Sequence, residues 1–87
     1  MKGFYIRAMK ILVDKNEPVS KLFGPYKTEV RKEVKAKGLP KMAKKLSEKQ
    51  YIVHEAYRRT HKKIKEDDKY KKYRKEYDQL VSDATNR

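Results

Sequence analysis

The last 47 residues of the chain, positions 41 to 87, contain neither glycine nor proline. These two residue types most readily end a helix, because proline lacks a backbone N–H and glycine retains the most backbone freedom. Their absence from more than half of a chain of 87 residues permits long, uninterrupted helices. Together with the spacing of the apolar residues, this predicts an all-α fold, a small domain of three to four helices.

The composition limits the size of the hydrophobic core. Charged residues make up 43% of the chain and hydrophobic residues 37%, so seven tyrosines and two phenylalanines must supply much of the core volume. A chain of this length forms at most one domain. We expect an amino-terminal extension over 1–17 with a helical preference, a basic helical domain over 18–83 and a flexible tail over 84–87.

Glycine and proline divide the first half of the chain. The letters DKNEP (14–18) predict a loop, and Pro25 suits the first position of a helix, where its missing N–H costs nothing. Val30 and Val34 continue an apolar spacing of four residues, which indicates an amphipathic helix. We expect that helix to end at KGLP, with Gly38 in a left-handed cap.

The division of the second half is open between two alternatives. Apolar residues at helical spacing over 41–64 favour one continuous helix. The letters SEKQ (47–50) match a capping box and instead favour a new helix at that point. Further on, the apolar stripe changes phase, which predicts a break near KEDDK with Asp67 or Asp68 as the N-cap.

Few residues suggest catalysis. The three glycines are isolated, so the chain has no glycine-rich phosphate loop, and no serine lies in a recognisable nucleophile motif. The chain has no cysteine, and His54 and His61 alone make a poor zinc site. We therefore expect a protein that is not an enzyme and that uses no metal and no cofactor.

The most apolar stretch is too short and too polar to span a membrane. GFYIRAMKILV (3–13) is interrupted by Arg7 and Lys10, whereas a spanning helix needs about 20 apolar residues. It also lacks the features of a secretory signal. The sequence predicts no membrane partner and an intracellular location; it does not distinguish nucleus, nucleoid and virus.

The basic charge is the strongest indication of function. The net charge is +13, and the stretch from Pro25 to Leu46 holds eight lysines and arginines against two glutamates. Such an excess predicts nucleic acid as the partner, with duplex DNA ahead of RNA, bound mainly through phosphates. The residues expected to bind it are Lys21, Phe23, Lys27, Arg31, Lys41, Lys44, Lys45, Arg58, Arg59 and Lys62.

Several segments resemble the HMG-box family. An aromatic pair, Phe23 and Tyr26, leads into TEVRKEVKAKG, which is followed by KMAKKLSEKQ and later by EDDKYKKYRKEYDQL. The resemblance covers 18–81 and implies three helices in an L that bind and bend DNA at the minor groove, with little sequence specificity. It places Gly24 where the family often carries an apolar wedge and Gln50 where it carries tryptophan.

Two other classes of protein fit the sequence. Residues 17–34 could form the two short helices of a helix-turn-helix regulator, with Thr28 and Arg31 on the reading helix. Alternatively, the chain is a protein-interaction module, for example of a virus, whose basic helices dock on an acidic partner. The sequence does not define the oligomeric state.

Overall fold

The chain is helical almost throughout in a computed structural model that describes residues 2–41 and 45–85. The elements are α1 (Lys2–Lys15), α2 (Glu17–Lys37), α3 (Glu48–Glu66), the short 3-10 helix η2 (Asp68–Tyr70) and α4 (Lys71–Thr85). No strand occurs among these residues, and the predicted all-α class is confirmed.

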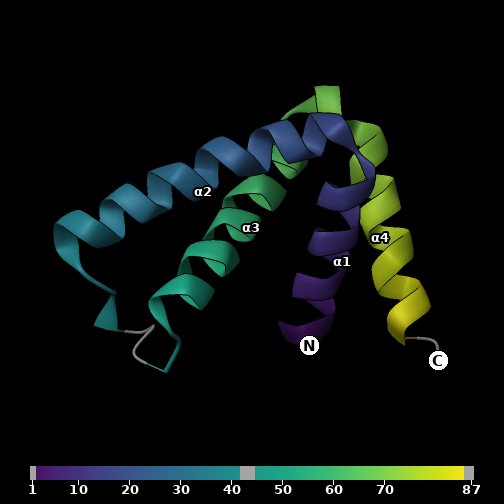
Figure 1. Ribbon diagram of the computed structural model, residues 1–87. Helices are drawn as coiled ribbons and strands as arrows, with labels where there is room; N and C mark the ends of the chain where they lie inside the picture. The colour runs from purple at the N-terminus through teal and green to yellow at the C-terminus, as the bar shows by residue number, and fades with distance from the viewer. Residues whose placement is uncertain (1, 42–44, 86–87) are drawn as a thin grey trace.

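The four helices form two arms that meet at one end (Figure 1). Helices α2 and α3 lie side by side in one arm, and α1 and α4 lie side by side in the other. The arms join where α1 turns into α2 and where α3 passes through η2 into α4. Because α3 contacts all three other α-helices, both arms depend on its position.

The main hydrophobic core lies where the arms meet. Every α-helix contributes to it, including Met9 and Leu12 from α1, Val19 from α2, Ile64 from α3 and Tyr73 from α4. Each is nearly or completely buried, and full burial of such a side chain contributes about 1.5–3 kcal/mol. The amino-terminal helix is therefore part of the packed core.

A second apolar cluster holds the arm of α2 and α3 together. It consists of Val30 and Val34 from α2 and Ile52 from α3, with Leu39 and Tyr51 packed against them. Among the described residues, three of this cluster are buried. The two helices are also joined by Phe23, which stacks on Tyr57, and by polar side chains.

Helix α2 is longer than the sequence predicts. The expected loop at 14–18 and helix start at Pro25 are wrong, because one helix runs without interruption from Glu17 to Lys37. For the same reason, 17–34 does not form the two short helices of a helix-turn-helix. Pro18 lies in the first turn, where no N–H is needed. Pro25 lies inside the helix, where its missing N–H removes one backbone hydrogen bond, and its ring is exposed.

The connection between α1 and α2 is reduced to Asn16. Its side-chain Nδ2 donates to the carbonyl oxygen of Leu12 at 3.0 Å and to Oε2 of Glu76 at 3.0 Å. The second bond reaches α4, so this single residue links the end of α1 to the other helix of its arm.

Helix α3 begins at the predicted capping box. The Ser47 hydroxyl accepts from the backbone N–H of Gln50, and the Gln50 side chain accepts from the N–H of Ser47, both at 3.1 Å. The alternative of one continuous helix over 41–64 is therefore wrong. The predicted break is confirmed at Asp67, which ends α3 and whose carboxylate accepts from the N–H of Lys69.

Arg74 fixes the start of α4 against the end of α3. Its Nε donates to the carbonyl oxygen of Ile64 at 2.7 Å, and its Nη2 pairs with Asp68 at 3.0 Å. Helix α4 then continues through Ala84 and Thr85, two residues that the sequence assigned to a flexible tail. Nothing in the sequence of this last turn breaks a helix.

The two described glycines in and after α2 should respond oppositely to alanine. Gly38 has a φ of 76°, as its capping role predicts, although its ψ of −177° lies outside the left-handed helical region. Gly24 is in the helix, and an added Cβ would meet no atom within 4 Å at either position. Gly38→Ala should therefore lower the free energy of unfolding by about 1 kcal/mol, and Gly24→Ala should raise it by about 0.5–1 kcal/mol. Urea denaturation measures both, and equal effects would contradict the assigned backbone conformations.

Tyr5 carries a buried hydroxyl in an aromatic cluster. Its ring lies edge-on to His61 at 5.4 Å and to Tyr77 at 6.2 Å, and the described residues give its hydroxyl no hydrogen-bond partner. Burial raises the pKa of Tyr5 to about 12. Tyr5→Phe should match or exceed the parent in thermal stability, by up to about 1 kcal/mol, because it removes an unsatisfied group. Tyr5→Leu should destabilise by about 1–2 kcal/mol through lost ring contacts; a destabilised Tyr5→Phe would reveal a bonded hydroxyl.

Candidate nucleic-acid interface

Helix α2 separates its charges onto two flanks. Lys27, Arg31 and Lys35 recur every four residues and form one row. Glu29 and Glu33 each follow a member of that row by two residues, a rotation of about 200° around the helix axis. One flank of α2, here called the basic flank, therefore carries the row of three cations, and the two glutamates lie on the opposite flank, where Lys32 and Lys37 are their neighbours.

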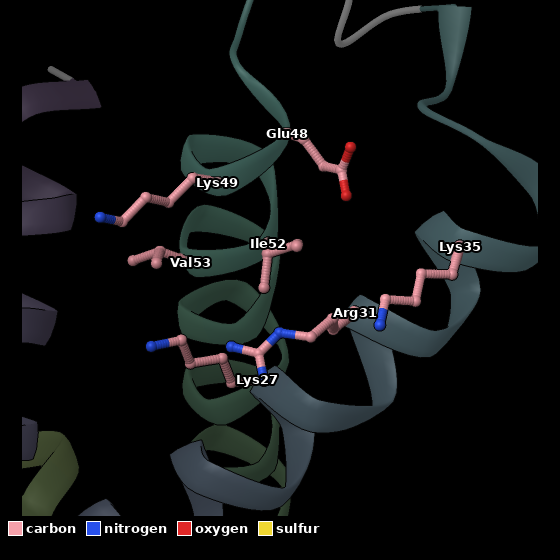
Figure 2. Close-up of a pocket in the computed structure, with 7 residues that line it drawn as sticks. All are labelled: Lys27, Arg31, Lys35, Glu48, Lys49, Ile52 and Val53. Atoms are coloured by element: carbon pink, nitrogen blue, oxygen red, sulfur yellow. The ribbon is translucent and has the colours of Figure 1, made fainter.

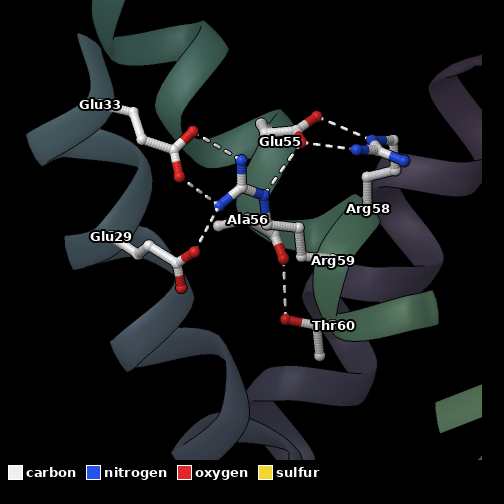
Figure 3. A network of polar contacts seen from close by, with 7 residues as sticks. All are labelled: Glu29, Glu33, Glu55, Ala56, Arg58, Arg59 and Thr60. Carbon is white, nitrogen blue, oxygen red and sulfur yellow. Dashed lines mark hydrogen bonds and ion pairs between the residues drawn. The ribbon is translucent and has the colours of Figure 1, made fainter. Parts of the chain in front are cut away.

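The flank with the two glutamates is bound to Arg59 of α3 (Figure 3). The Arg59 guanidinium contacts Glu29 at 3.0 Å and binds both carboxylate oxygens of Glu33, at 2.7 and 2.8 Å. Its Nε donates to Glu55 at 3.0 Å, and Glu55 also pairs with Arg58 at 2.7 Å. These five residues, here called the Arg59 network, join α2 to α3 on one side of the arm.

The Arg59 network favours the ionised form of two of its carboxylates, those of Glu33 and Glu55. The hydrogen bond from Arg59 lowers the pKa of Glu33. Hydrogen bonds from Arg58 and then Arg59 lower the pKa of Glu55, against an opposing effect of burial. Glu29 and Glu33, the two glutamates of α2 that follow Pro25, therefore both form ion pairs with Arg59. Neither lies on the basic flank of α2.

The basic flank of α2 borders a groove of about 390 Å³ between α2 and α3 (Figure 2). The residues lining the groove are Lys27, Arg31, Lys35, Glu48, Lys49, Ile52 and Val53. In the close-up, Lys27 and Lys49 extend their amino groups to the same side, and Glu48 points away from them. The groove therefore has cations from both helices along its opening.

The spacing of the row suits a chain of phosphates. Four residues of an α-helix advance by about 6 Å, which is comparable with the distance between successive phosphates of a nucleic-acid strand. None of Lys27, Arg31 and Lys35 forms an ion pair within the described part of the chain. The three charges are therefore available to an external polyanion.

Only two of the predicted binding residues, Lys27 and Arg31, line the groove. Arg59 is instead paired with three carboxylates, and its side chain is 22% exposed. It is therefore less available to nucleic acid than we predicted from the sequence. Phe23 stacks on Tyr57 with ring centroids 4.6 Å apart and packs against the main core. Its predicted contact with nucleic acid is not supported, because the ring is used in packing.

Three other predicted lysines, Lys21, Lys41 and Lys45, lie away from the groove lining. Lys21, in the second turn of α2, pairs with Glu17 at 3.3 Å. Lys41 and Lys45 are exposed in the connection between α2 and α3. Lys44 lies outside the described residues.

Arg58 and Lys62 lie on the far side of α3. Val53 lines the groove, and Lys62 follows it by nine residues, or two and a half turns, which places it about 180° around the helix. Arg58 is exposed and pairs with Glu55. These two cations therefore do not share a surface with Lys27 and Arg31.

Sequence reasoning missed Lys35 and Lys49. The four-residue spacing from Lys27 through Arg31 would have included Lys35, had the cations been analysed for periodicity as the apolar residues were. Lys49 carries no such signal. It belongs to the groove only because α3 packs alongside α2.

Comparisons with known proteins give no further assignment. No protein-family model, no curated protein and no solved structure matches the chain.

The segment KMAKKLSEKQ is one of those that resemble the HMG-box family. Within it, residue 45 lies in a turn and residue 46 in a bend, and α3 starts only after Ser47. No helix of the described residues is long and apolar enough to cross a membrane.

The Arg59 network should make stability depend on acidic pH. Glu33 and Glu55 have lowered pKa values when folded, so their contribution is present above their ordinary value of 4.5 and is lost as pH falls through the folded values. Arg59→Met should lower the free energy of unfolding by about 1 kcal/mol at pH 7 and flatten its dependence on pH between about 5 and 3.

The matched control is Arg31→Met, which removes an arginine outside every ion pair of the described residues. Its dependence on pH should follow that of the parent in urea denaturation. Identical pH profiles for Arg59→Met and the parent would show that the contacts of Arg59 contribute nothing to folding, since the pair of Arg58 and Glu55 remains in the variant.

Proposed function

We propose that this protein is a non-enzymatic nucleic-acid-binding protein that holds duplex DNA through the groove between α2 and α3. The observation that supports this most directly is the separation of charge across that arm. Arg59 neutralises Glu29 and Glu33 on one side, which leaves the row Lys27, Arg31 and Lys35 on the other. Four cations and one carboxylate, that of Glu48, line the groove, and an excess of positive charge attracts a polyanion.

The chemistry of the groove favours contacts with phosphates over contacts with bases. Lys27, Lys35 and Lys49 carry flexible point charges, and Arg31 is the only guanidinium that lines the groove. Base reading usually needs a fixed set of paired donors and acceptors, which these side chains do not provide. We therefore propose low sequence specificity and an affinity that falls with salt.

The HMG-box resemblance enters this proposal in part. An aromatic pair on a helix that leads into a basic segment supports it, as does the arrangement of helices in two arms. The amino-terminal segment differs, because it forms α1 where the family begins with an extended segment. Gly24 has no side chain to insert, and Phe23 is packed on Tyr57. We propose binding mainly by charge, with a preference for DNA that is already bent.

A second candidate function is docking of an acidic protein. It is favoured by Val53 in the groove lining, since an apolar contact beside four cations suits an acidic amphipathic helix. RNA is a further ligand of the same charge. Binding of an acidic peptide more tightly than duplex DNA at equal salt would favour the protein partner.

Removing the row of cations should weaken DNA binding and its dependence on salt. The combined variant Lys27→Ala, Arg31→Ala and Lys35→Ala should flatten the slope of log affinity against log salt by about 2–3 units, because each phosphate contact contributes about 0.9. Fluorescence anisotropy with a random duplex at several salt concentrations measures the slope.

The control variant carries the same loss of charge elsewhere: Lys15→Ala, Lys32→Ala and Lys37→Ala replace exposed lysines that do not line the groove. Its slope should change by less than about 1 unit. Equal losses in the two variants would show that only net charge matters and that the groove is not the binding site. Absence of parent binding at low salt would reject the proposed function itself.

A further inference from the structure

A second hollow lies on the other side of α3. It has a volume of about 240 Å³ and is lined by His61 and Lys65 from α3 and by Arg74, Tyr77 and Asp78 from α4. Arg74 is paired with Asp68, and Asp78 is the one carboxylate among the lining residues. The ring of His61 is tilted by 39° against that of Tyr77, with the two centroids 4.3 Å apart. Burial lowers the pKa of His61, which favours the neutral imidazole.

Exposed lysines flank this hollow on both helices. Lys62 is next to His61 on α3, and Lys71 and Lys75 lie on α4 within one turn of Arg74. With Lys65 they form the set called here the outer lysines: Lys62, Lys65, Lys71 and Lys75. No ion pair of the described residues includes any of them.

The two outer lysines of α3, Lys62 and Lys65, face away from the groove. Sixteen residues separate Lys49, which lines the groove, from Lys65, and this rotates the side chain by about 160° around α3. The rotation from Val53 to Lys62 is about 180°. Helix α3 is thus the common wall of two basic surfaces that point in different directions.

Acidic side chains already meet the N-terminus of the helical stretch of η2 and α4, because η2 leads directly into α4 and Asp67 and Asp68 stand at its start. The indication of a ligand is therefore the charge of the exposed outer lysines themselves. The charge complementarity therefore points to the same class of ligand as the groove.

We infer that one molecule binds two separate segments of duplex DNA, one in the groove and one on the outer lysines, and so bridges them. This inference rests on the proposed function, because it assigns the second surface the ligand proposed for the first. The 36 × 29 × 20 Å dimensions of the molecule would keep the two bound duplexes close together. Bridging needs no second protein copy, since α3 separates the two surfaces within one chain.

The experiment compares binding of one duplex with bridging of two. One duplex is fixed to beads, a second fluorescent duplex is free, and the fluorescence retained with sub-stoichiometric protein reports bridging. Anisotropy with a single short duplex reports binding alone. The test variant replaces the four outer lysines together: Lys62→Ala, Lys65→Ala, Lys71→Ala and Lys75→Ala. Alanine preserves helix propensity, and circular dichroism confirms that the variant folds.

The parent should bind one duplex and retain the second. The test variant should keep its affinity for a single duplex within about threefold, because the groove is intact, and lose at least about tenfold in retained fluorescence. The matched control replaces four exposed lysines outside both surfaces and should bridge like the parent: Lys10→Ala, Lys15→Ala, Lys32→Ala and Lys37→Ala.

Two outcomes would overturn the inference alone. The first is a parent that binds one duplex but never retains the second. The second is undiminished bridging by the test variant, because bridging would then come from two protein copies that each use the groove. A parent that binds no duplex in anisotropy would instead reject the proposed function.

Discussion

The contact between Arg59 and the carboxylates of α2 is the interaction on which the rest of the arm depends. Beyond the stacking of Phe23 on Tyr57, the apolar contact between α2 and α3 rests, in the described part of the chain, on a small cluster of three buried residues. Arg59 adds a polar link with Glu29 and Glu33. The same contact draws negative charge to one side, and in a chain of net charge +13 this leaves the opposite side strongly basic.

Stability and proposed function therefore share one set of residues. A mixed distribution of charge along α2 would stabilise an exposed helix through ion pairs four residues apart, as Lys21 and Glu17 do near its start. Beyond Pro25 the helix instead pairs its glutamates with α3 and leaves Lys27, Arg31 and Lys35 unpaired within the described residues. Such an arrangement forgoes local stabilisation and gives the groove an excess of positive charge.

Helix α3 organises the molecule because its sides meet different neighbours. Ile52 faces α2, Ile64 lies in the core where the arms meet, and His61 and Lys65 border α4. A single helix thus takes part in both hydrophobic clusters and both hollows. Its start and end are defined locally, by the Ser47 capping box and by Asp67, so the extent of these surfaces is set by short-range hydrogen bonds.

The sequence by itself determined what depends on neighbouring residues. The helical class follows from missing glycine and proline, and the boundaries at Ser47 and Asp67 follow from side chains that bond backbone within three residues. It misjudged α2 at Pro25, where the helix continues between the buried residues Val19 and Val30. Tertiary structure alone decided which cations are available to an external ligand, because the sequence does not show which neighbours a side chain will meet. Arg59 pairs with glutamates of α2, whereas Lys49 lines the groove because α3 packs alongside α2.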